Sequence, residues 1–232
     1  MPKGSVFVAG ATGATGQVFV PMATDAGLEL VLHVRPATAP RTPLGNDPRA
    51  RIFDLSDAAA LAAAMKGCDA VLSLVGTMRD RFKAGDTYEA SDVLSTQQLV
   101  AGAKAAGVPR FLLLSSLGAG GFGAYLKMKA ICEGVVRDSG LGWTIFRPSV
   151  LVSPERAGEP THGRRDAPPG MGGLFKVLRV VDHGRWTSRL APIPIDVLVR
   201  AFLHVLAEPR DGVVLEGRDL LALGAEHRVR VG

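Results

Sequence analysis

The stretch "VFVAGATGATGQVFV", residues 6–20, joins a short apolar run to three glycines that are spaced three residues apart. The run from Ser5 to Ala9 is rich in Val and Phe, which favours a buried strand because such side chains fit a pleated surface. Beyond Gly16, apolar residues recur at helical spacing, at Val18, Phe19, Met22 and Ala23. The stretch therefore predicts a strand, a glycine-rich turn and a helix.

Such a turn is suited to an anionic ligand. Glycine allows positive φ and close approach of the backbone, and the N–H groups and dipole of the following helix face the space above the turn. A pyrophosphate meets all of these conditions, although a plain strand–turn–helix connection without a ligand is the alternative interpretation. The residues predicted to contact the pyrophosphate are Gly10, Thr12, Gly13, Ala14, Thr15 and Gly16.

The composition is typical of a globular enzyme. The 232 residues are 47% hydrophobic and 21% charged, and the longest apolar runs are too short to span a membrane. The net charge of +5 is spread over scattered arginines, so we expect no nucleic-acid partner, and an anionic ligand explains the excess equally well. Cys68 and Cys132 match no metal spacing and are interpreted as reduced thiols of a cytoplasmic protein that lacks a signal peptide.

Strands and helices alternate along the chain after the first helix. Further strands are predicted at residues 28–34, 50–55, 69–76, 110–116 and 142–148. Helices are predicted at 57–65, 87–106, ending at Gly107, and 125–139. The nearly continuous apolar strands indicate a sheet that is covered on both faces, so we predict an α/β fold with a doubly wound parallel sheet. The glycine-rich turn then opens the first βα unit, as a dinucleotide-binding fold requires.

The second part of the chain is less regular. Residues 153–192 carry many Pro, Gly and Arg residues, with a possible amphipathic helix at 173–181. A helix is predicted within 193–209, a strand at 212–217 and a short helix at 218–224. We therefore expect one domain, residues 1–232, with 153–192 as an irregular lobe on the substrate side.

The end of the second strand indicates which dinucleotide binds. A carboxylate there would accept hydrogen bonds from a ribose 2′-OH, but this chain has Arg35, nineteen residues after Gly16. A guanidinium pairs with a 2′-phosphate, so we predict NADP(H), with a solvated arginine as the alternative. Asp54, followed by Leu55, is placed to accept from the adenine amino group; its alternative role is an N-cap of the next helix.

The candidates for chemistry lie in "SSLGAGGFGAYLKMK", residues 115–129. Tyr125 and Lys129 are four residues apart and share one face of the predicted helix. A phenol with a pKa near 10 is a poor proton donor unless a nearby cation stabilises its anion, and Lys129 supplies such a cation while holding the nicotinamide ribose. Ser116, at the tip of the fifth strand, is placed to orient a substrate carbonyl. The alternative is a half-buried Tyr beside a surface Lys.

The predicted substrate side contains apolar and basic residues. Met78, Phe82, Phe122, Met171, Phe175 and Trp186 lie in segments expected around the nicotinamide end, and they indicate either an apolar pocket or ordinary core positions. A basic group is interpreted as a solvated face or as an attractant for an acidic substrate. Its members are Arg164, Arg165, Lys176, Arg179, Arg185 and Arg189.

Several segments together resemble the atypical short-chain dehydrogenase/reductases, in the NmrA-like group that is similar to the Tat-interacting protein. The most specific are "VAGATGATG" (8–16), "GTMRDRFKAG" (76–85), "LLLSSLGAG" (112–120) and "YLKMKAICEGVV" (125–136). The resemblance continues through "RPA" (35–37), "FRPSVL" (146–151), "IPIDVLVRAFLHVL" (193–206) and "LEGRDLLALG" (215–224), so it covers nearly the whole chain.

The resemblance implies a Rossmann fold, bound NADP(H) and a Ser116, Tyr125 and Lys129 constellation. It also implies that Gly76 and Thr77 line the cofactor ribose and that Pro148 and Val150 approach the nicotinamide. The chain departs from the family in its shorter, glycine-rich segment from Ser116 to Tyr125. In some relatives the serine role falls one position later, where this chain has Leu117.

We therefore expect an NADP(H)-dependent oxidoreductase that reduces a small apolar carbonyl or quinone-like substrate. One alternative is a non-catalytic NADP(H) sensor that binds a protein partner, and another is a sugar-nucleotide epimerase or dehydratase. The expected partner is a small molecule, with no nucleic acid, membrane or metal; assembly with a second copy or another protein stays open.

Overall fold

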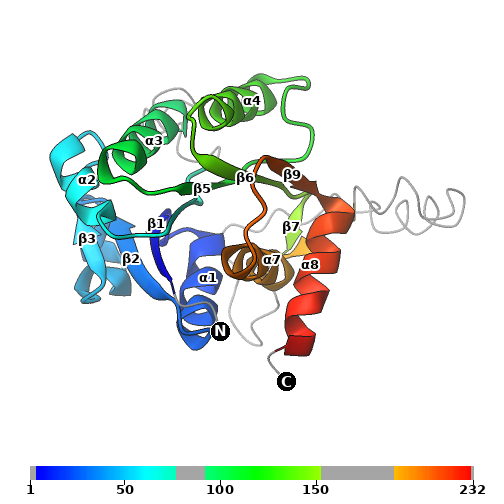
Figure 1. Ribbon diagram of the computed structural model, residues 1–232, viewed down its shortest axis with the longest axis horizontal. Helices are drawn as coiled ribbons and strands as arrows, with labels where there is room; N and C mark the ends of the chain where they lie inside the picture. The colour runs from blue at the N-terminus through cyan, green and yellow to red at the C-terminus, as the bar shows by residue number, and fades with distance from the viewer. Residues whose placement is uncertain (1–3, 77–91, 153–190, 231–232) are drawn as a thin grey trace, which may run out of the picture.

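The computed structural model describes residues 4–76, 92–152 and 191–230. These residues form a parallel sheet of seven strands in the order β3-β2-β1-β4-β5-β6-β9 (Figure 1). The strands are β1 (Ser5–Ala9), β2 (Glu29–Val34), β3 (Ala50–Ile52), β4 (Ala70–Ser73), β5 (Arg110–Leu114), β6 (Gly142–Arg147) and β9 (Val213–Glu216). Successive strands add outward on one side up to β3 and then on the other side from β4. The protein is thus a doubly wound α/β, Rossmann-like fold, and the switch point lies between β1 and β4.

Helices cover both faces of this sheet (Figure 1). One layer contains α1 (Ala14–Asp25), α7 (Ile195–Ala207) and α8 (Gly217–Arg230), and the other contains α2 (Ala58–Met65), α3 (Leu94–Ala106) and α4 (Ala124–Arg137). Side chains of β1 alternate between the two layers, because Val6 and Val8 pack toward α1 and α7 whereas Phe7 packs toward α2 and α3. Both faces of the strand are therefore apolar, as the sequence predicts.

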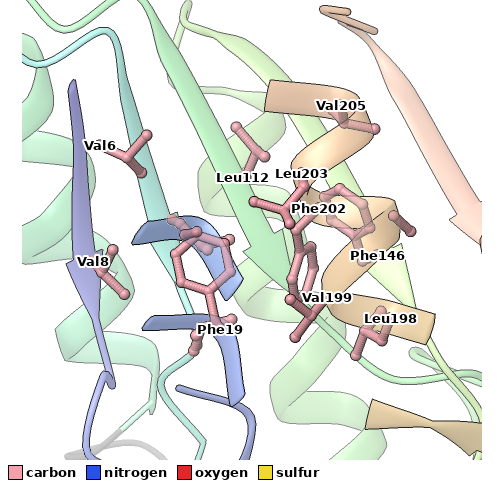
Figure 2. Close-up of a cluster of buried hydrophobic side chains, with 14 of the residues drawn as sticks. Val6, Val8, Phe19, Leu112, Phe146, Leu198, Val199, Phe202, Leu203 and Val205 are labelled. Carbon is pink, nitrogen blue, oxygen red and sulfur yellow. The ribbon is translucent and has the colours of Figure 1, made fainter. Parts of the chain in front are cut away.

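The core beneath α1 and α7 is built on three phenylalanines. Phe202 of α7 meets Phe146 of β6 edge to face at a centroid distance of 4.6 Å and Phe19 of α1 at 6.3 Å. Figure 2 shows these rings with Leu112 and Val8 of the sheet around them. Edge-to-face pairs add about 0.5–1.5 kcal/mol beyond the burial of their area. This packing fixes α1, and with it the turn that precedes α1, against the sheet.

The second layer is held together by close helix contacts and by conventional caps. Gly102 of α3 lies so close to α2 that an added Cβ would come within 2.6 Å of Leu61. α2 begins at Asp57, whose carboxylate accepts from the Ala60 N–H at 2.9 Å. α3 ends at Gly107, which has a φ of +73°. The predicted stop of this helix is confirmed.

Several element boundaries differ from the sequence prediction. β1 has the predicted bounds, but the third strand was expected over 50–55 and β3 covers only Ala50–Ile52. The last helix, expected over 218–224, is the longer α8. The first residues of the helix expected over 87–106, up to residue 91, the helix expected at 173–181 and most of the lobe at 153–192 lie outside the described residues. Two short 3-10 helices and two short strands were not predicted: η1 (Ala39–Arg41), η2 (Pro43–Asn46), β7 (Leu151–Val152) and β8 (Ile193–Pro194).

The short strands β7 and β8 pair in parallel and form a small sheet of their own. Their pairing brings the segment after β6 beside the segment that leads into α7, through the register Leu151 to Ile193. No helix within the described part of the chain is long and apolar enough to cross a membrane.

Candidate functional site

The glycine-rich turn lies at the carboxyl end of β1, next to the carboxyl end of β4. Gly10 has a φ of +85°, and a Cβ at this position would lie 2.8 Å from the carbonyl carbon of Leu74. The Gly13 N–H donates to the Gly10 carbonyl at 3.0 Å and closes the turn. Gly10 is therefore required both by its backbone conformation and by the closeness of the two strand ends.

The other two glycines differ in what surrounds them. A Cβ at Gly16 would lie 2.5 Å from the carbonyl oxygen of Gly10 and closer still to that of Ala11, so Gly16 allows α1 to approach the turn. Gly13 is exposed, and within 4 Å a Cβ there would meet only the Gly10 oxygen, at 3.3 Å. Gly10 and Gly16 thus shape the turn, while Gly13 presents an open backbone surface.

The turn fits the pyrophosphate of a dinucleotide. α1 starts at Ala14 with Gly13 as its N-cap, and no side chain caps the helix. The N–H groups of the first turn, with the positive end of the helix dipole, therefore point toward the space where an anion would lie. Ala14 is exposed and Thr12 is half-buried, whereas Thr15 is buried beneath the turn.

The residues predicted at the adenosine end lie at the carboxyl ends of β2 and β3. Arg35 directly follows β2 and is exposed, and Asp54 follows β3 and is also exposed, while Leu55 is buried. β2 and β3 are neighbours, with Val34 paired to Ile52, so both charged residues lie at the same edge of the sheet. The N-cap of α2 is Asp57, so the alternative role of Asp54 as that cap is wrong.

A buried histidine stabilises this edge. His33 of β2 is 5% exposed, and its Nε2 atom lies 2.9 Å from the carbonyl oxygen of Phe53. Burial lowers the pKa of His33, and the neighbouring Arg35 charge lowers it further. His33 is therefore neutral near pH 7 and links the ends of β2 and β3 without adding charge to the edge.

The tyrosine of the predicted constellation lies at the start of α4. The helix follows a segment in which Gly118, Gly120 and Gly123 have φ values of +80°, +91° and +98°. Tyr125 is 36% exposed, and Phe122, just before it, is fully exposed. Tyr125 therefore lies partly open to solvent at the first turn of α4.

Lys129 lies one turn further into α4 and is 3% exposed. Its Nζ atom is 3.2 Å from Oδ2 of Asp92, 3.5 Å from the carbonyl oxygen of Val75 and 5.7 Å from the centre of the Tyr125 ring. A Cβ on Gly76 would lie 3.7 Å from the same Nζ. The structure therefore brings Tyr125, Lys129 and Gly76 together at the carboxyl end of β4.

A second buried acid, Glu133, lies one turn beyond Lys129. Its Oε1 accepts from the Ser115 hydroxyl at 2.6 Å and from Nε of Arg147 at 2.8 Å, and its Oε2 accepts from Nη2 of Arg147 at 2.6 Å. Arg147 also pairs with Glu216 at 3.0 Å, and the hydrogen bonds to Glu133 raise the Arg147 pKa. This network connects α4, one turn beyond Lys129, to the residue that follows β5, to β6 and to β9.

The predicted serine lies beside the remaining residues that were predicted to approach the nicotinamide. Ser116 is half-buried, and its hydroxyl donates to the carbonyl of Leu117 at a long 3.4 Å. The Leu117 N–H in turn donates to the Pro148 carbonyl at 2.8 Å. Pro148 is buried, and Val150 is 56% exposed. Ser115 is bound to Glu133, so of the two serines Ser116 has the hydroxyl nearer to solvent.

Other predicted residues lie outside the described part of the chain. They are Thr77, Met78, Phe82, Met171, Phe175, Trp186 and the basic group from Arg164 to Arg189. Within the described residues, no cluster of three or more His, Cys, Asp or Glu side chains could hold a metal ion. Cys68 and Cys132 are free and buried, and burial raises the pKa of each thiol.

Sequence reasoning missed Asp92, Glu133 and Arg147. Glu133 was open to prediction, because Tyr125, Lys129 and Glu133 are spaced by four residues and share one helix face. Asp92 and Arg147 carry no such pattern. Asp92 is 37 residues from Lys129, and Arg147 is 14 residues from Glu133, so only the folded chain brings these charges together.

Comparison with known proteins agrees with this geometry. Residues 10–173 match a family model described as NAD(P)H-binding. Over 97% of its length the chain is 30% identical to protein HTATIP2 of Rattus norvegicus, of which it covers 91%.

Among solved structures, two similar folds cover more than nine-tenths of the chain. A short-chain dehydrogenase/reductase superfamily protein from Agrobacterium tumefaciens with bound NAD has a TM-score of 0.63 and 19% identity, and the match covers 96% of this chain and 81% of that one. A UDP-N-acetylglucosamine 4-epimerase from Bacillus cereus has a TM-score of 0.62 and 15% identity, with 91% and 77% covered. The chain belongs to the NAD(P)H-binding family, as an atypical short-chain dehydrogenase/reductase-like protein.

Proposed function

We propose that the protein is an NADP(H)-dependent reductase of small apolar carbonyl or quinone-like compounds. The observation that carries this proposal is the placement of the Lys129 ammonium 5.7 Å from the Tyr125 ring, at the carboxyl ends of the strands where such folds bind their ligands. An exposed phenol beside a buried cation is an arrangement that donates a proton to a developing alkoxide.

Different residues of the chain would bind different parts of the cofactor. The turn from Gly10 to Gly16 would hold the pyrophosphate, and Lys129 with Gly76 would hold the nicotinamide ribose. Arg35 would pair with a 2′-phosphate, which supports NADP(H) over NAD(H) because the exposed guanidinium follows β2 where a carboxylate would select a free 2′-OH. A bound reduced nicotinamide supplies the hydride.

The remaining groups act on the substrate. Tyr125 would donate its phenolic proton to the substrate oxygen, and the Lys129 charge would stabilise the phenolate that is left. Ser116 would orient the carbonyl by a hydrogen bond. Phe122, three residues before Tyr125, and Val150, two residues after Pro148, are exposed apolar side chains, which supports an apolar substrate.

Two other functions make different predictions. A sugar-nucleotide epimerase or dehydratase is favoured by the fold shared with the Bacillus cereus enzyme. A non-catalytic NADP(H) sensor would use the same turn and Arg35 but would not need the phenol beside Lys129.

A panel of substrates separates the three functions. Purified protein is incubated with NADPH and an aldehyde, a ketone or a quinone, and the loss of NADPH absorbance is followed. Turnover of at least one compound is expected. Tight NADPH binding without turnover of any compound would favour the sensor. In a parallel incubation with a UDP-sugar and the oxidised cofactor, interconversion of the sugar without net reduction of the cofactor would favour the epimerase.

A further inference from the structure

Lys129 is held by a buried charge of opposite sign, on Asp92, which lies two residues before α3. The Asp92 carboxylate lies 3.2 Å from the Lys129 ammonium, and the two side chains are 2% and 4% exposed. The backbone of Asp92 is itself anchored, because the Thr96 hydroxyl donates to the Asp92 carbonyl at 2.7 Å. The pair therefore joins the start of α3 to the middle of α4 beside the Tyr125 ring.

The buried Lys129 ammonium needs an opposite charge close to it. Taking an isolated charge out of water is costly, and a buried Lys without a partner becomes neutral or moves toward solvent. The carbonyl of Val75, at 3.5 Å from Nζ, is at the limit of hydrogen-bond distance and carries no net charge. The Asp92 carboxylate supplies the charge that compensates the buried ammonium.

We propose that Asp92 is a positioning residue for the cofactor site: its carboxylate holds the Lys129 ammonium in place beside Tyr125 and Gly76 before any ligand binds. The inference rests on the proposed function, because that function assigns Lys129 to the nicotinamide ribose. Preorganisation of this kind lowers the cost of ordering a flexible side chain when the ligand arrives. Asp92 therefore contributes to binding through Lys129 without itself contacting the cofactor.

Two ligands separate this role from a merely structural one. NADPH spans the whole site, whereas adenosine 2′,5′-bisphosphate lacks the nicotinamide and its ribose. Asp92→Asn keeps the shape of the side chain and removes its charge. We expect about tenfold weaker NADPH binding, measured by calorimetry or fluorescence, and unchanged binding of adenosine 2′,5′-bisphosphate.

A double-mutant cycle with Lys129→Met tests the route of the effect. If Asp92 acts through Lys129, then Asp92→Asn has no further effect on NADPH affinity once Lys129 is replaced. The matched control is Asp211→Asn, which removes the partner of Arg110 at the amino end of β5. This control is expected to leave the affinities of both ligands unchanged.

Four results would overturn the inference. One is an equal loss of affinity for both ligands in Asp92→Asn, and another is an undiminished effect of Asp92→Asn in the Lys129→Met background. The third is a loss for Lys129→Met with none for Asp92→Asn, which leaves the proposed function intact. If Lys129→Met itself leaves NADPH affinity unchanged, the assignment of Lys129 in the proposed function is wrong and the inference fails with it.

The double-mutant cycle also keeps the inference testable if Asp92→Asn fails to fold. Circular dichroism and thermal unfolding report whether Asp92→Asn remains folded. Should it not, the protein with both Asp92→Asn and Lys129→Met has no uncompensated buried charge and is expected to fold. Its NADPH affinity should equal that of Lys129→Met alone, and a further loss would contradict the inference.

Discussion

The glycine-loop end (residues 9–16 with Arg35) and the Tyr–Lys end (residues 115–117, 125–133 and Arg147) are built by different means. The first is made of backbone: Gly10 has positive φ, Gly16 lets α1 approach the turn, and Gly13 leaves an open surface. The second is made of buried charges, in which Lys129 meets Asp92 and Glu133 meets Arg147 and Ser115.

The difference has a physical cause. A pyrophosphate is large and highly charged, so peptide N–H groups and a helix dipole bind it without side chains. The proposed proton transfer uses one phenol and one ammonium in a fixed geometry, and burying the ammonium is costly unless an opposite charge compensates it. The glycine-loop end therefore depends on glycines, which have no side chain to block the ligand. The Tyr–Lys end depends on buried side chains of opposite charge that pair with one another.

The largest expected effect is at the Tyr–Lys end. Tyr125→Phe removes the acidic proton and keeps the ring, so kcat on a reduced substrate should fall by about 10²–10⁴-fold while NADPH affinity barely changes. Lys129→Met should lower both, because it removes the cation beside the phenol and the contact to the ribose. Steady-state kinetics and NADPH titration measure these effects. Full turnover by Tyr125→Phe would mean that the proton comes from water or from another group.

The next largest effect is expected on stability, from the hydrogen-bond network of Glu133 in α4. Glu133→Gln removes the buried anion that binds Arg147 and leaves Glu216 as the carboxylate paired with it, so we expect the free energy of unfolding in urea to fall by about 1.5–3 kcal/mol. Asp211→Asn is the matched control, because Asp211 is 50% exposed opposite Arg110 and should cost less than about 1 kcal/mol. Equal losses for the two variants would show that the Glu133 network is no more important than a surface pair.

The glycine-loop end should show binding and folding effects at separate positions. Gly13→Val adds a side chain to the open surface, so NADPH affinity should fall about a hundredfold in a protein that remains folded. Gly16→Ala forces a Cβ against two carbonyl oxygens, so the free energy of unfolding should fall by about 1–3 kcal/mol. Unchanged NADPH affinity in Gly13→Val would remove the turn from the site.

The smallest expected effect is at Arg35. Arg35→Asp replaces the guanidinium by a carboxylate that repels a 2′-phosphate, so NADPH affinity should fall about tenfold or more while NADH affinity changes little. Binding titrations with both cofactors measure the ratio. A wild-type protein that binds NADH as tightly as NADPH would contradict the predicted preference.

Local sequence patterns determine much of the fold and half of the site. The glycine spacing, the apolar strands and the stop at Gly107 depend on residues that are neighbours along the chain, so β1, the start of α1 and the end of α3 were predictable. Tyr125 and Lys129 were likewise predictable, because a spacing of four residues is a property of the helix itself. Boundaries such as those of β3 and α8 were not, since packing against neighbouring elements decides where a strand or helix ends.

The α/β order, the glycine-rich turn and the spacing of Tyr125 and Lys129 could all be predicted from the sequence, because each follows from residues within one or two turns or strands. The charges that surround the Tyr–Lys helix could not be predicted in this way. Asp92 contacts Lys129 although the two are 37 residues apart along the chain, and Arg147 contacts Glu216 although they are 69 residues apart. No local pattern carries such pairings, because they form only when a parallel sheet brings distant strand ends to one edge and excludes water around them.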